Sequence, residues 1–154
     1  MKLTPALPLV ATLVAAACSD AGTGPGDLRL EIATHRALWE ASRPERYTYA
    51  LKRLCFCAVE AIGPVRVVVS GDSVISRTYV EGGDTVGPNE VDLFPGVDGL
   101  FRVLDDAIAS GAADIRVTWD DRLGYPTEIS IDYLAMAVDD ELGLVITELP
   151  ASSD

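Results

Sequence analysis

Apolar residues recur with a helical period in the stretch that follows residue 26. The run begins after Asp27, a suitable N-cap residue, and the Arg43-Pro44 pair ends it. Its apolar positions lie three and four residues apart, with Trp39 beside them: Leu30, Ala33, Ala37, Leu38 and Ala41. This spacing predicts an amphipathic helix that buries the five-residue stripe.

Three strands are predicted after this helix. Residues 46–57 are rich in aromatic and β-branched side chains, which favour strands. Residues 65–70 and 73–80 flank Gly71-Asp72, a two-residue link typical of a tight hairpin. Residues 81–97 are rich in glycine, proline and acidic residues, and they are predicted to form the longest loop.

The second half of the chain has the same order of elements. Asp98 can cap a second helix, and Gly111 stands where a C-terminal capping glycine belongs. The apolar stripe of this helix is Leu100, Phe101, Leu104, Ala107 and Ile108. Strict alternation then predicts strands at 115–119 and 129–133 around a turn at 120–127. A last strand, at 142–149, follows the Asp139-Asp140 turn.

The order helix, three strands, helix, three strands predicts an α+β fold. Hairpins make neighbouring strands antiparallel, so we expect a single antiparallel twisted sheet with two helices packed on one face. The predicted organisation is a signal sequence at 1–18, a flexible tether at 19–26, one domain at 27–150 and a short tail at 151–154. At 154 residues, the chain has room for one ordinary domain.

The first 18 residues have the character of an export signal. Lys2 supplies a positive charge, and residues 7–17 form an apolar segment that is too short to span a bilayer. Ala15-Ala16-Ala17-Cys18 is similar to a bacterial lipobox, in which the cysteine thiol receives a diacylglyceryl group. The alternative is an ordinary secretory signal with a chance cysteine nearby. We therefore expect Cys18 to be lipidated, and we expect this lipid to anchor the domain to a membrane of the cell envelope.

Because Ser19 follows the cysteine where an aspartate would favour retention at the inner membrane, we expect sorting to the periplasmic side of the outer membrane in a diderm organism.

Charge is distributed unevenly along the chain, whose formal net charge is −12. Residues 19–78 carry 7 acidic and 8 basic side chains, whereas residues 79–154 carry 17 acidic and 3 basic ones. Such an acidic half repels phosphate backbones, so we expect no binding to nucleic acid. The acidic half serves either solubility alone or the recognition of a cationic partner or a divalent ion.

Four separated motifs resemble those of an uncharacterised family of small bacterial lipoproteins, domain-of-unknown-function family 6174. They are Arg53-Leu54-Cys55-Phe56-Cys57 followed by Gly63-Pro64-Val65-Arg66-Val67, then Val97-Asp98-Gly99-Leu100-Phe101, Arg122-Leu123-Gly124-Tyr125-Pro126, and Ile129-Ser130-Ile131-Asp132. The resemblance covers residues 38–149. It implies a fold and an envelope location but no activity. A proline often follows the second cysteine in the family, where this chain has Ala58.

Cys55 and Cys57 are the two cysteines that remain once Cys18 is acylated. In a regular strand their Cα atoms would lie about 6.6 Å apart, at the edge of the range that a disulfide can bridge, so a bridge requires the chain to turn at Phe56. Three alternatives remain open for the pair: a strand-end disulfide, two buried thiols, or a redox-active pair or one that binds a soft metal such as copper(I). Zinc is disfavoured, because it prefers four ligands and the mature chain offers two cysteines and one histidine.

His35, the sole histidine, is expected to be solvated on the first helix, and no nucleophile motif accompanies it. The acidic clusters at 105–106, 120–121 and 139–141 lack the spacing of a calcium loop. We therefore expect no metal site, no cofactor and no catalytic triad.

A polar stripe on the fifth strand is the more informative feature. Glu128, Ser130 and Asp132 alternate with apolar residues, which predicts that one face of the sheet is wet and available to a partner. Tyr125 is a candidate ligand-stacking residue beside it, or it packs against Trp119 or the sheet edge. The leading hypothesis is a non-enzymatic binding module of the envelope with an unidentified protein or ligand as its partner. The alternative is a thiol-redox or metal-handling protein that uses Cys55 and Cys57.

Overall fold

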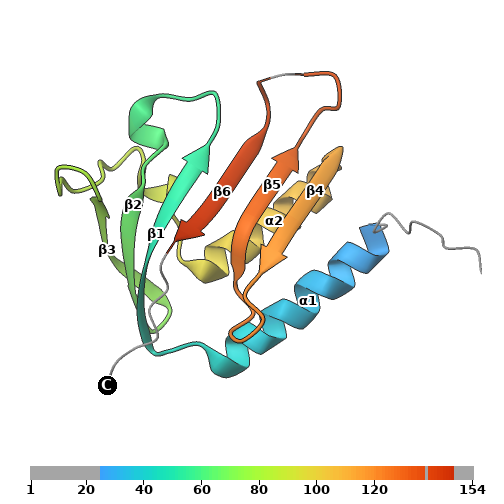
Figure 1. The fold of residues 1–154 in the computed structure, drawn as a ribbon, viewed down its shortest axis with the longest axis horizontal. Coiled ribbons are helices and arrows are strands. Elements are labelled where there is room, and N and C mark those ends of the chain that lie inside the picture. The colour runs from blue at the N-terminus through green and yellow to red at the C-terminus, as the bar shows by residue number, and fades with distance from the viewer. Residues whose placement is uncertain (1–24, 138, 148–154) are drawn as a thin grey trace, which may run out of the picture.

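The computed structural model describes residues 25–137 and 139–147 (Figure 1). Along the chain the main elements are α1 (Pro25–Ser42), β1 (Arg46–Leu54), β2 (Val65–Ser70), β3 (Ser73–Tyr79), α2 (Val97–Ser110), β4 (Asp114–Trp119), β5 (Pro126–Asp132) and β6 (Leu142–Thr147). Two short 3-10 turns, η1 (Val59–Ala61) and η2 (Val91–Leu93), lie in the connections. None of the described helices is both long and apolar enough to cross a bilayer.

The strands form one antiparallel sheet in the order β3-β2-β1-β6-β5-β4. Each half of the chain supplies a three-stranded meander, and the two meanders join where β6 pairs with β1. The α+β class with a single antiparallel sheet is therefore confirmed. The bounds of β2 coincide with the predicted strand at 65–70.

The sheet has one covered face and one open face. On β1, Tyr47, Tyr49 and Leu51 are buried, whereas the residues between them are partly exposed. Both helices pack on the covered face, with α1 against Trp119 of β4 and α2 against β5. In Figure 1, α2 lies behind the sheet and α1 runs across its lower part. The residues on the opposite face, which we call the open face, are covered by no other described element.

The first helix buries a different stripe from the predicted one. Leu30 is 69% exposed and Leu38 is 36% exposed, whereas Ile32 and Trp39 are fully buried. The alanine-rich helix offers several apolar stripes, and the orientation that packs its largest side chains against the sheet prevails. The helix also begins at Pro25, two residues before the predicted cap at Asp27, since proline suits a first helical turn.

The second helix agrees with its predicted pattern. Leu100, Phe101, Leu104 and Ala107 are buried, as the stripe requires. Gly111 adopts φ +74° at the C-terminus, and its N–H is bonded to carbonyls of the last turn. The N-cap is Gly96 rather than Asp98, and this leaves the Asp98 side chain available for other contacts.

Residues 80–96 cover the part of the sheet that the helices do not reach. Phe94 is fully buried, and its carbonyl accepts a hydrogen bond from Nε of Arg77 on β3 at 2.6 Å. The hydroxyl of Tyr49 donates to the carbonyl of Pro95. The predicted long loop is therefore a structured cover for β1, β2 and β3.

Candidate functional site

The polar stripe of β5 lies on the open face. Glu128 and Ser130 are exposed and Asp132 is half-buried, whereas Ile129 and Ile131 between them are only 1% exposed. The alternation that was read from the sequence therefore separates a dry face from a wet one. The open face is therefore a candidate binding surface formed by regular elements.

Charges on the open face are separated by strand. Basic side chains lie on one half, namely Arg46 and Lys52 on β1 and Arg66 on β2. Acidic side chains predominate on the other half, namely Glu128 and Asp132 on β5 and Asp114 on β4, where Arg116 is the one basic side chain of these two strands. The face is thus bipolar, with the small or apolar residues of β6 between its halves.

The strand register sets the spacing of these charges. Lys52 and Glu128 both pair with Val145 of β6, from opposite sides. They are therefore separated by two strand spacings, about 9–10 Å. Among the described residues, no ion pair joins the basic half to the acidic half. Both halves remain available to a partner.

Asp114 and Asp132 face each other directly across β4 and β5. Like charges in this arrangement are unfavourable. Arg116 offsets part of the repulsion through an ion pair with Asp114 at 2.8 Å. Oδ1 of Asp132 is buried and has no hydrogen-bond partner among the described residues, so this carboxylate retains an unused acceptor.

Tyr125 does not belong to the open face, contrary to its inclusion among the candidate binding residues. It is 7% exposed, and its ring packs edge-on against Trp39 with centroids 6.0 Å apart, rather than against Trp119. Burial raises the pKa of its hydroxyl. The reason is the preceding turn, which folds back onto α1: at Gly124, φ is +81° and an added Cβ would lie 2.5 Å from the carbonyl oxygen of His35.

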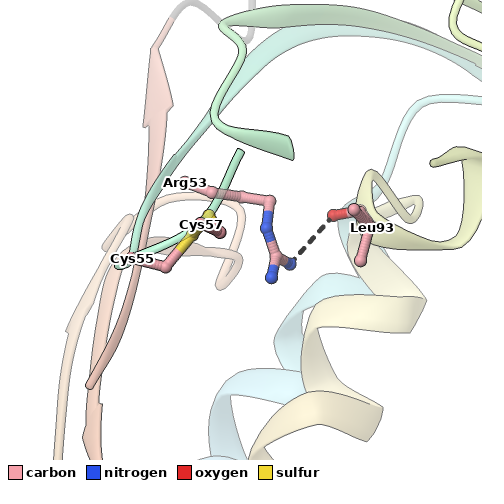
Figure 2. Close-up of a disulfide and its surroundings, with 4 residues drawn as sticks. All are labelled: Arg53, Cys55, Cys57 and Leu93. Carbon is pink, nitrogen blue, oxygen red and sulfur yellow. Dashed lines mark hydrogen bonds between the residues drawn. A yellow bond between two sulfur atoms is a disulfide. The ribbon is translucent and has the colours of Figure 1, made fainter. Parts of the chain in front are cut away.

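Cys55 and Cys57 form a disulfide just after the end of β1 (Figure 2). The chain bends at these residues, which shortens the Cα separation to 5.4 Å. Of the three alternatives left open by the sequence, the structure contains the strand-end disulfide. Cys57 is exposed, Cys55 is half-buried, and Phe56 between them is 88% exposed.

Arg53 lies beside the disulfide on the covered side of the sheet. Figure 2 shows its guanidinium directed toward the carbonyl oxygen of Leu93, to which Nη1 donates a hydrogen bond at 3.3 Å. Burial lowers the pKa of this guanidinium. Arg53 thus ties the strand end to the loop that covers it.

The expectation that His35 is solvated is wrong. Its ring is stacked on Trp119 with centroids 4.3 Å apart and planes 3° apart, and its Nδ1 is buried without a hydrogen-bond partner in the part of the chain that the structure describes. Nε1 of Trp119 donates to Glu31 at 2.6 Å. His35 therefore helps to attach α1 to β4.

The acidic clusters are partly explained by local contacts. Asp105 forms an ion pair with Arg36 of α1 at 2.6 Å. Oδ1 of Asp120 accepts hydrogen bonds from the backbone N–H groups of Arg122 and Leu123 and so shapes the β4–β5 turn. Within residues 25–137 and 139–147, no three His, Cys, Asp or Glu side chains lie close enough together to hold a metal ion.

A charged cluster around Asp98 was missed by sequence reasoning. Its carboxylate accepts a hydrogen bond from Nε1 of Trp39 at 2.8 Å and pairs with Arg43 at 2.9 Å. Arg43 also pairs with Asp72 of the β2–β3 hairpin at 2.6 Å. The cluster joins α1, α2 and the hairpin. The available signal in the sequence was Asp98 itself, whose position before the apolar stripe of the second helix predicts only a helix cap.

An open pocket of about 450 Å³ lies beside this cluster. Its lining includes Tyr47, Arg77, Asp92, Asp98, Arg102 and Asp106. Burial raises the pKa of Tyr47 to about 12, and the Tyr47 hydroxyl accepts a hydrogen bond from the N–H of Val97. Four carboxylates, Asp72 among them, and two arginines line the pocket, so its charged lining is acidic on balance.

Comparison with known proteins identifies a family for this fold and its four motifs. No curated protein and no solved structure matches the chain. The model of the family of unknown function DUF6174 matches residues 31–151, which include α2, all six strands and the last two thirds of α1. The chain therefore belongs to the family of unknown function DUF6174.

Proposed function

We propose that this protein is a lipoprotein of the bacterial cell envelope, anchored through Cys18, that binds an envelope protein or ligand through the open face of its sheet. The lipobox-like Ala15-Ala16-Ala17-Cys18 supports the anchor. Cys18 lies outside the described residues. The proposed role is non-enzymatic, because the polar side chains of the open face are spread over several strands rather than gathered at one point.

The bipolar open face is the observation that carries this proposal. The protein has a net charge of −12, yet the strand residues of this face are close to neutral. Their charged members are Arg46, Lys52, Arg66 and Arg116 against Asp114, Glu128 and Asp132. A surface kept near neutral on an acidic protein, with most of its acidic charges on one half and most of its basic charges on the other, suits a partner of complementary pattern.

A photo-crosslinking experiment tests the binding surface. A photoreactive residue at Ser130 in the full chain should give a discrete adduct in cells, whereas the same residue at Ala33, which is exposed on α1 away from the open face, should give none. Reversing two charges with Glu128→Lys and Asp132→Lys should weaken the Ser130 adduct, because complementary charge sets the orientation of binding. Equal labelling at Ser130 and Ala33 would contradict the proposal.

The anchor has a separate test. Mass spectrometry of the mature N-terminus should find diacylglyceryl on Cys18, and Cys18→Ala should release the protein from membranes. A mature chain that starts elsewhere and carries no lipid would exclude the lipoprotein assignment.

A second candidate function is thiol–disulfide exchange at Cys55 and Cys57. The exposure of Cys57 within a formed disulfide favours it, because an accessible sulfur can be attacked by a thiolate. The partner's dithiol would give up two electrons and become a disulfide while Cys55 and Cys57 become thiols. Equilibration in thiol redox buffers, followed by alkylation and mass spectrometry, should then show reversible reduction of the folded protein. A disulfide that stays oxidised in strongly reducing buffer would exclude this function, and elemental analysis of the reduced form would test for a soft metal.

A further inference from the structure

The exposed apolar side chains gather at one end of the sheet. Nine large hydrophobic residues are exposed among those described, and three of them, Leu30, Leu38 and Ile75, lie on α1 and β3. The other six lie at the strand ends and in the connections at the end where β1 stops and β6 starts. We call them the apolar tip: Leu54, Phe56, Val59, Val80, Leu134 and Met136.

Strand pairing places these residues together. Leu54 at the end of β1 pairs with Gly143 at the start of β6, and Ile131 at the end of β5 pairs with Leu142. The β1–β2 and β5–β6 connections therefore emerge at the same end of the sheet, the upper end in Figure 1. Phe56 is 88% exposed and Met136 is 96% exposed, which is nearly the exposure of isolated side chains. Several large apolar side chains exposed at the same end of a domain indicate an interaction site.

The β1–β2 part of the apolar tip is held rigidly. The disulfide closes on both sides of Phe56, and the N–H of Arg53 donates to the carbonyl of Ile62 at 2.8 Å across the base of the connection. The hydroxyl of Tyr79 donates to the carbonyl of Glu60 at 2.8 Å. These bonds prevent the connection from folding back to bury Phe56. The exposure of its ring is therefore a property of the fold.

We propose that the apolar tip inserts into the interfacial region of the bilayer that carries the acyl anchor. This inference rests on the proposed anchoring at Cys18. The tip would fix the orientation of the domain on the membrane, so that the open face of the sheet stands roughly perpendicular to the bilayer and stays accessible to its partner.

The length of chain before the first helix permits this contact. Leu28 and Glu31 of α1 line a pocket with Ile115 and Val117 of β4, and β4 starts at the same end of the sheet as the apolar tip. The first turns of α1 thus lie about 3–10 Å along the strand direction from that end. The six residues from 19 to 24 span up to about 20 Å when extended, which exceeds this offset.

The chemistry of the apolar tip indicates which occupant it suits. Its side chains project from separate connections, and fluid lipid can close around separate apolar groups without matching their shape. Residues 55–64, 80–84 and 133–141 contain no Lys or Arg. Their exposed acids include Glu60, Glu81 and Glu141. The tip should therefore enter zwitterionic lipid and be repelled by anionic lipid.

Tryptophan fluorescence of the acylated full chain in phosphatidylcholine vesicles tests the inference. Phe56→Trp and Met136→Trp would each be compared with wild type, whose Trp39 and Trp119 supply the spectrum to be subtracted. In vesicles with brominated acyl chains, the added emission should fall by about half or more, since interfacial apolar groups sit about 5–10 Å deep. Ile75→Trp, which is exposed on β3 toward the other end of the sheet, is the matched control and should not be quenched.

The outcomes separate this inference from the proposed function. If mass spectrometry confirms the acyl group but neither tip tryptophan is quenched, the inference is overturned and the anchor stands. Quenching of Ile75→Trp equal to that of Phe56→Trp also overturns it. If Cys18 carries no lipid, the proposed anchor is wrong. The quenching of the tip tryptophans is then measured with concentrated vesicles, and a lack of quenching there again refutes insertion. Quenching that increases when anionic lipid is added contradicts the charge argument and therefore the inference.

Discussion

Removing the Asp98 carboxylate should destabilise the fold by about 3 kcal/mol. Trp39 is fully buried and its indole N–H donates to Asp98, so Asp98→Ala leaves a buried donor unpaired. That loss costs about 1–3 kcal/mol. The ion pair with Arg43 is partly exposed and adds at most about 1 kcal/mol, and loss of a carboxylate from the first turn of α2 adds about 0.3–1 kcal/mol.

Urea unfolding followed by circular dichroism measures this difference. For a domain of this size the midpoint should fall by about 1–3 M, with the slope unchanged. Asp72→Ala is the matched control, because Asp72 bonds the same Arg43 but its side chain is 83% exposed. Its substitution should cost at most about 1 kcal/mol.

A double-mutant cycle with Trp39→Phe isolates the indole contact. Phenylalanine removes the donor, so Asp98→Ala should cost about 1–3 kcal/mol less in that background than in wild type. The reasoning is refuted if Asp98→Ala costs no more than Asp72→Ala. It is refuted equally if the cost is the same with and without the indole.

Three further predictions concern the turn, the tyrosines and the disulfide. Gly124→Ala should cost more than about 2 kcal/mol in urea unfolding, since it adds a Cβ 2.5 Å from a carbonyl oxygen at positive φ, whereas Gly71→Ala, also at positive φ but in open space, should cost only about 1–2 kcal/mol. The pKa of Tyr47 is raised to about 12 in the folded state. The stabilisation that its neutral hydroxyl gives to the fold is therefore complete below pH 10 and is lost as pH rises from about 10 through 12. Tyr47→Phe should therefore show a smaller fall in urea midpoint over that range, and an unchanged fall would contradict the assignment. The Cys55–Cys57 disulfide closes a very short loop, so its reduction should lower the free energy of unfolding by only about 1–2 kcal/mol in thermal melts. Global unfolding on reduction would be inconsistent with this view.

Local patterns along the chain were sufficient to predict the elements. Strict alternation at Ile129 and Ile131 reports which strand residues are dry, because the two sides of a strand meet different environments. The hairpin at Gly71 and the helix end at Gly111 followed from the conformations that only glycine adopts easily. These features depend on neighbours in sequence, so no knowledge of the whole fold was needed.

Features that depend on distant partners were predicted poorly. The alanine-rich first helix presents several apolar stripes, and the buried one is set by Trp39 meeting Asp98 and Tyr47 from other elements. His35 looked solvated because its stacking partner Trp119 is far away in sequence. Tyr125 looked available because the contact of Gly124 with α1 is invisible along the chain.

The candidate site divides in the same way. The sequence by itself determined the α+β class, the wet side of β5 at Glu128 and Ser130, and the closeness of Cys55 to Cys57, since each follows from spacing along one segment. Only the tertiary structure decided that β6 inserts beside β1. That pairing unites the basic and acidic halves of the open face and brings the β1–β2 and β5–β6 connections to one end, where they form the apolar tip. Pairing between strands about 90 residues apart is selected by the burial of the whole sheet, and no local pattern encodes it.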